Sequence, residues 1–142
     1  MRWEGSRARD MLALTLAAQG ELARARALFL QNMIVLRDLG ALRELAELFG
    51  SMMATWRLEG ATDECSFLLR LAGAGSSLLE NLNSPMSPSA AAQVERNLTE
   101  LRAHVGAARI DAWWAEGRLM TWPAAIAYAL KPRRASDVTR AE

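Results

Sequence analysis

Apolar residues in the first part of the chain recur every three or four positions, the spacing of one face of an α-helix. The first such run contains Leu12 and stops at Gly20. The second contains Phe29 and stops near Gly40. Because so short a link leaves room only for antiparallel neighbours, residues 6–39 are predicted to form a helical hairpin.

The same arrangement returns in residues 41–80. Apolar residues in helical register lead up to Gly60, and a further helix is expected from Thr62 onward. The apolar positions of the helix before Gly60 are Leu42, Leu45, Leu48, Met52 and Trp56. Aligned on Gly20 and Gly60, the two hairpins match at a constant offset of 40 residues. This second hairpin is therefore predicted to repeat the first.

Matched positions in the two hairpins have similar sizes. Ala25 corresponds to Cys65, both small, and Phe29 corresponds to Leu69, both large. Small residues allow two helices to approach closely, and a large residue one turn later fills the space beside them. A fixed period of this kind is typical of repeats that bury one hairpin on the next. The sequence predicts an all-α stack.

The composition changes between Asn81 and Ser89, where prolines and turn-forming residues gather. Beyond this boundary, residues 87–130 are predicted to form further helices that cap the stack. Ser87 is the expected N-cap of the first, followed by Pro88 and an apolar stripe. That stripe is Val94, Leu98, Leu101 and Val105.

Two shorter helices are expected to complete the cap. One runs from Ala107 to Glu116 and ends at Gly117, and the other follows a cap at Thr121. Residues 131–142 are polar and lack periodicity, so we expect a disordered tail. The single helical-repeat domain is then residues 1–130.

Composition and net charge indicate which partners and which cellular compartment to expect. The chain has 142 residues with 17 Lys and Arg against 16 Asp and Glu, so no strong field attracts nucleic acid or an anionic membrane. Cys65 is the only cysteine, and no leader pattern or long apolar run is present. We expect a cytoplasmic protein that binds neither nucleic acid nor membrane.

The spacing Leu12-Ala13, Leu16, Gly20, Ala25 and Phe29 resembles the tetratricopeptide signature. Asn32 departs from it, because a small residue is usual there, and Arg9 stands where the first large aromatic is usual. Residues 111–130 closely resemble the segment that ends the helical-repeat region of large bacterial ATP-binding regulators, including LuxR-type transcriptional activators. The resemblance covers residues 8–130 and implies a right-handed stack of hairpins at the sensor or interaction end of a signal-responsive regulator.

The residue types that carry catalysis are sparse. His104 is the sole histidine, so neither a metal site nor a cofactor is expected, and Cys65 is interpreted as a small packing residue at a helix crossing. The segment Gly73–Ser77 lacks the lysine of a phosphate loop and is interpreted as a flexible part of a helix. No phosphate-binding loop and no DNA-reading helix-turn-helix are found. We expect no enzymatic activity.

Three tryptophans near the end of the chain, Trp113, Trp114 and Trp122, allow two interpretations. Large aromatics plug the end of a small helical domain, and they are also enriched at protein interfaces. Because adjacent helical residues lie about 100° apart, Trp113 and Trp114 cannot both point fully inward. One of them is expected to be partly exposed.

The first helices of the two hairpins are expected to line a concave face that grips another protein or a peptide. The side chains on this face that packing does not require are Arg7, Asp10, Leu14, Glu47, Ala54 and Arg57. The favoured function is thus a protein-interaction module. Two alternatives remain: a self-associating structural domain that forms a homodimer, and a sensor that binds a small-molecule effector.

Overall fold

The computed structural model describes residues 4–55 and 62–131, and within these ranges the chain is helical and forms no strand. The helices are α1 (Glu4–Ala18), α2 (Leu22–Leu39), α3 (Leu42–Met52), the 3-10 turn η1 (Met53–Thr55), α4 (Thr62–Asn81), α5 (Pro88–Val105), α6 (Ala107–Arg118) and α7 (Trp122–Leu130). The prediction of an all-α fold is confirmed. Within the described ranges, no helix combines the length and the apolar content needed to cross a bilayer.

The first two helices form the predicted hairpin, and glycines end both. Gly20 (φ 86°) and Gly40 (φ 68°) take the left-handed conformation that follows many helix ends. The Gly20 N–H donates to Ala17 O, and the next N–H reaches back to Leu16 O at 2.9 Å. These bonds satisfy the last carbonyls of α1 and turn the chain directly into α2.

The second hairpin keeps the interval of 40 residues at its second helix, because α2 begins at Leu22 and α4 at Thr62. Its first helix is shorter than expected. α3 ends at Met52 and tightens into η1, while the remainder of the expected helix lies outside the described residues. Both matched small residues, Ala25 and Cys65, are buried.

Local capping sets the start of α5 and of α7, as predicted. The Ser87 Oγ accepts a hydrogen bond from the Ala90 N–H, and the Thr121 Oγ1 accepts one from the Ala124 N–H, both at 3.3 Å. A proline follows each cap in the first turn, where its missing N–H costs nothing. The predicted tail falls outside the described residues except for Lys131.

The expectation that Gly117 ends a helix is wrong. α6 continues to Arg118, and Gly117 is buried within it against the backbone of α4. A Cβ at Gly117 would overlap the carbonyl of Arg70, and one at Gly73 would overlap the carbonyl of Trp114. The two helices therefore cross in near backbone contact, which only glycine allows.

The segment Gly73–Ser77, predicted to be a flexible part of a helix, lies within α4 at these crossings. Gly75 faces the carbonyl of Ala46 in α3, just as Gly73 faces α6. The adjacent Ala74 is fully packed in the core. These glycines serve the close approach of neighbouring helices on two sides of α4.

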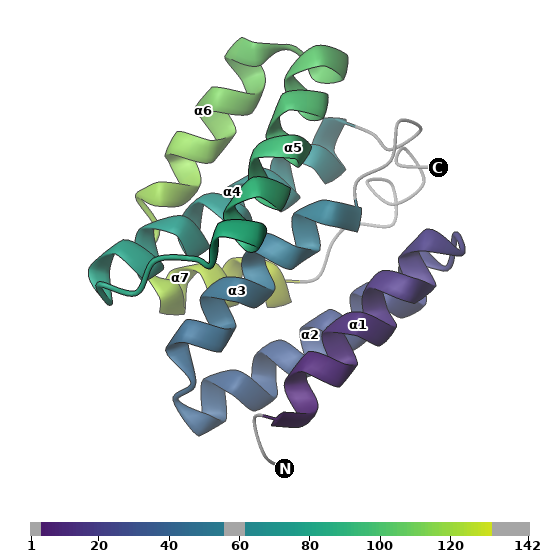
Figure 1. Cartoon of the computed structure of the whole chain (residues 1–142), viewed down its shortest axis with the longest axis vertical. Coiled ribbons are helices and arrows are strands. Elements are labelled where there is room, and N and C mark those ends of the chain that lie inside the picture. Colours follow the sequence, from purple (N-terminus) through teal and green to yellow (C-terminus); the bar gives the residue numbers. More distant parts are fainter. Residues whose placement is uncertain (1–3, 56–61, 132–142) are drawn as a thin grey trace.

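Figure 1 shows the three hairpins following one another across the molecule, with α3 and α4 between the α1–α2 pair and the α5–α6 pair. One buried cluster joins α2, α3 and α4 around Phe29, Phe49 and Leu68, and a second joins α4 to α5 and α6 around Leu101 and Ile110. The last helix, α7, turns back and adds its apolar face to the first cluster.

A row of side chains along α4 ties the flanking helices together. Arg26 of α2 forms an ion pair with Glu64, and its guanidinium lies 5.6 Å from the centre of the Phe67 ring. The Phe67 ring packs against Tyr128 of α7, with 5.4 Å between ring centres. The Tyr128 hydroxyl accepts a hydrogen bond from Arg70 at 3.3 Å. Side chains of α2 and α7 thus meet on the same side of α4.

Candidate functional site

The side chains predicted for the concave face lie on α1, α3 and η1 where the structure describes them. Arg57 and the side chain of Arg7 lie outside the described part of the chain. Leu14 is half-buried and packs against the first core cluster. Ala54 is half-buried in η1, while Glu47 is exposed and forms an ion pair with Arg43 at 3.3 Å.

Asp10 is the member of this predicted set with the most unusual environment. It is half-buried between α1 and α2, and its Oδ1 accepts a hydrogen bond from the Asn32 Nδ2 at 2.7 Å. Burial raises the pKa of the Asp10 carboxyl to about 6; the Asn32 hydrogen bond opposes this shift and the charge of Glu47 adds to it. The structure therefore brings Asp10 and Glu47 close enough to interact.

Asn32 is fully buried, and in the sequence it is recognisable only as a departure from the tetratricopeptide pattern. Its partner Asp10 lies 22 residues away in the chain. At the 40-residue offset, the second hairpin has Gly50 and Ala72 in the places of Asp10 and Asn32. The polar pair is therefore particular to the first hairpin and is not required by the packing of a repeat.

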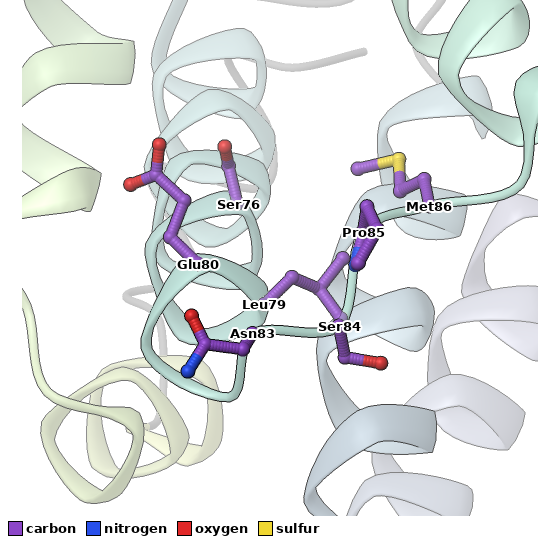
Figure 2. Close-up of a pocket in the computed structure, with 7 residues that line it drawn as sticks. All are labelled: Ser76, Leu79, Glu80, Asn83, Ser84, Pro85 and Met86. Atoms are coloured by element: carbon purple, nitrogen blue, oxygen red, sulfur yellow. The ribbon is translucent and has the colours of Figure 1, made fainter.

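A second candidate region lies at the C-terminal end of α4, where two depressions flank the last turns of the helix. The first has a volume of about 460 Å³. Figure 2 shows Ser76 and Glu80 of α4 on one side of it and Pro85 and Met86 of the following loop on the other, with Leu79 between them. Asn83 and Ser84 close its lower edge in that view.

The loop that forms this wall is held in one conformation by hydrogen bonds to α4. Asn83 has φ 50°, a left-handed value that asparagine tolerates better than most residues. Its N–H donates to Glu80 O, and the Ser84 N–H donates to Leu79 O, both at 3.0 Å. These two bonds are the Schellman pattern, so the loop leaves the helix at a fixed angle.

Two arginines from other helices brace the same depression. Arg118 of α6 donates to the Ser76 Oγ at 3.1 Å and pairs with Glu80. Arg43 of α3 donates to the Ser84 Oγ. The polar groups around the depression are thus oriented by α3 and α6, which favours a preformed surface.

The second depression has a volume of about 400 Å³ and lies toward the start of α7. Its lining residues are Leu78, Asn81, Met120, Thr121, Trp122 and Pro123. Trp122 and Met86, one beside each depression, both pack against the buried cluster of Ala46, Leu78 and Leu79. We call the two depressions together the α4-end surface.

Of the three tryptophans predicted as interface candidates, only Trp122 lies at the α4-end surface. Trp113 and Trp114 are both half-buried and pack against the cluster that contains Leu101 and Ile110. The depressions were not predicted from the sequence, because the segment after α4 was interpreted only as a boundary. The available signal was Pro85-Met86, a rigid residue beside a flexible apolar one.

Groups with catalytic potential elsewhere do not gather into a site in the part of the chain that the structure describes. Cys65 is buried, and burial raises the pKa of its thiol above the usual value. His104 is exposed in the last turn of α5. Among the described residues, His, Cys, Asp and Glu form no group of three that could hold a metal ion.

Comparisons with protein-family models, with curated proteins and with solved structures find no match to this chain.

Proposed function

We propose that this protein is a non-enzymatic interaction module that binds another protein or a peptide, at the sensor or interaction end of a signal-responsive transcriptional regulator. The observation that carries the binding part is the α4-end surface. It combines Trp122, Met86 and Met120 with two prolines around preformed depressions. Tryptophan is enriched at binding hot spots, and methionine adapts its shape to varied apolar partners.

The dimensions of the surface suit a short segment of a partner. Each depression is large enough for one or two side chains, with the buried Leu79 at the base of the first and the buried Leu78 at the base of the second. Asn81, Asn83 and Thr121 supply polar groups at the rims. An apolar centre with a polar rim is the usual composition of a recognition surface.

The tetratricopeptide-like stack is part of this proposal. It is supported by the 40-residue interval between the starts of α2 and α4 and by the burial of the matched pairs Ala25 with Cys65 and Phe29 with Leu69. The regulatory part rests on the resemblance of residues 111–130. It is checked by examining whether an ATP-binding or DNA-binding region is encoded beside this domain in the genome.

The binding part is tested by selecting peptides on the immobilised protein from a random displayed library. Peptides that bind this surface should bind the Met86→Ser and Met120→Ser variants more weakly, because Met86 lines the first depression and Met120 the second. Ala27→Ser on the exposed side of α2 is the control that should leave binding unchanged. Selected peptides that bind all variants equally would contradict the assignment of the surface.

A small-molecule effector is the second candidate, and the volume of the first depression favours it. A volume of about 460 Å³ lies within the range of small-ligand sites. A thermal-shift screen of metabolites tests this function, because a ligand of the folded state raises Tm. A hit whose shift disappears in Met86→Ser would support an effector over a peptide.

A further inference from the structure

The outer face of α1 exposes large apolar side chains. Met11 is 65% exposed and Leu12 52%. Ala8 and Thr15, one turn before and after, are exposed on the same face. The Thr15 Oγ1 already donates to Met11 O at 2.9 Å, so covering this face would not leave the hydroxyl unsatisfied. The described residues of this face carry no charge.

The chain itself shows what such a face packs against. At the 40-residue offset, Ala8 and Leu12 correspond to Leu48 and Met52 of α3. Leu48 and Met52 are fully buried in the cluster that joins α3 to Phe29 of α2. α3 itself packs against the preceding hairpin, contacting α2 and also α1. The equivalent face of α1 lacks such a partner among the described residues.

Of the helices that come second in their hairpins, α6 has an outer face that is open to receive the α1 face of another molecule. Among the described helices, α2 is packed by α3 and α7, and α4 by α3, α6 and α7, whereas α6 packs mainly on α4 and α5. Leu119, just after α6, is the most exposed large hydrophobic residue described, at 87%. Ala108, Ala112 and Ala115 are exposed on the same side of the helix.

Two carboxylates that border this face of α6 are already paired within the chain. Asp111 accepts from Arg102 at 2.9 Å, and Glu116 accepts from Arg70 at 2.8 Å. A helix docked between them would meet alanines and Leu119 without leaving either carboxylate uncompensated. Figure 1 shows α6 on the opposite side of the molecule from α1, so one chain cannot join its own two faces.

We propose that the α1 face of one copy docks on the α6 face of a second copy, so that chains associate head to tail. The contact continues across two chains the stacking that α3 makes on α2 within one chain. Each copy offers one face of each kind, so the association is heterologous and can extend beyond a dimer. A single-helix contact is small, so we expect weak association that grows with concentration.

Sedimentation velocity over micromolar to millimolar concentrations tests this proposal with two single variants. Leu12→Arg on α1 and Ala112→Arg on α6 should each be monomeric, because a charge in the contact has no partner. Mixed in equal amounts, the two variants should form a dimer and nothing larger. The mixture retains one intact α1 face and one intact α6 face, which can meet once only.

Ala27→Arg on α2 is the matched control and should associate like the unchanged protein. Circular dichroism checks that every variant keeps its helical content. A monomer at all concentrations would overturn the proposal. So would an α1-to-α1 dimer, recognised because Leu12→Arg abolishes it while Ala112→Arg leaves it intact. None of these variants alters the α4-end surface, so the result is independent of the proposed peptide binding.

Discussion

Asn32 donates a hydrogen bond from Nδ2 to Asp10 Oδ1 across the first hairpin, at 2.7 Å, and holds a carboxyl group at the place where the second hairpin has only Gly50 and Ala72. The pair fixes α1 against α2 by a directional contact at a crossing that small residues could also fill. It also makes the stability of the hairpin sensitive to pH, because Asp10 is half-buried.

Asp10→Asn should stabilise the protein at neutral pH. The pKa of Asp10 is about 6 in the folded chain against 3.8 in the unfolded chain, so between these values the folded state binds more protons. The free energy of unfolding therefore falls as the pH rises through this window. Discounted for partial exposure, the gain on substitution is about 1–2 kcal/mol at pH 7. Urea unfolding from pH 4 to pH 7 measures it.

The same series has an internal control in Asp38→Asn, at the exposed end of α2, where a surface ion pair contributes little. Asparagine at position 10 can still accept from Asn32, so the hairpin contact survives the change. A D10N variant that is less stable than the parent at pH 7 would show that the carboxylate is held by interactions stronger than its burial cost.

Asn32→Ala should destabilise the fold by about 1–3 kcal/mol, since it removes the donor to a half-buried carboxyl group. The substitution also leaves a small void at a fully buried position. A double-mutant cycle with Asp10→Ala, which removes the acceptor, separates the hydrogen bond from the void. Purely additive effects of the two changes would indicate that the contact adds nothing to stability.

Gly117→Ala should destabilise the protein by about 3 kcal/mol or more, because its Cβ would overlap the Arg70 carbonyl and force α6 away from α4. Gly50→Ala is the matched change in α3, where an added Cβ meets nothing within 4 Å. It should stabilise by about 0.5–1 kcal/mol through helix propensity. Thermal unfolding of both variants checks the opposite signs, and equal effects would refute the proposed close crossing.

Cys65 should react slowly with an aromatic disulfide reagent while the protein is folded. The thiol is buried, and burial raises its pKa. Both the access of the reagent to the thiol and the thiolate fraction are therefore low at about pH 7–8. Reaction should become fast in urea once the chain unfolds. Cys65→Ala should keep the fold, as its counterpart Ala25 suggests. Rapid labelling of the folded protein would contradict the packing role.

The local chemistry of helix ends could be predicted from the sequence because it involves only neighbouring residues. Gly20 and Gly40 end their helices by adopting positive φ, and Ser87 and Thr121 cap theirs through a hydrogen bond three residues on. The 40-residue interval is also a property of the chain alone. These features fix where helices begin and end, and they were predicted within a few residues.

Only the tertiary structure decided which helices touch, because contacts between distant residues leave no local pattern. Gly117 has the appearance of a helix stop, yet it is a contact point with Arg70, which lies far from it in the sequence. The pairing of Asp10 with Asn32, the return of α7 to the first core cluster and the depressions beside Leu79 arise in the same way. The sequence by itself determined a chain of capped helices; their packing determined which of its surfaces are open to a partner.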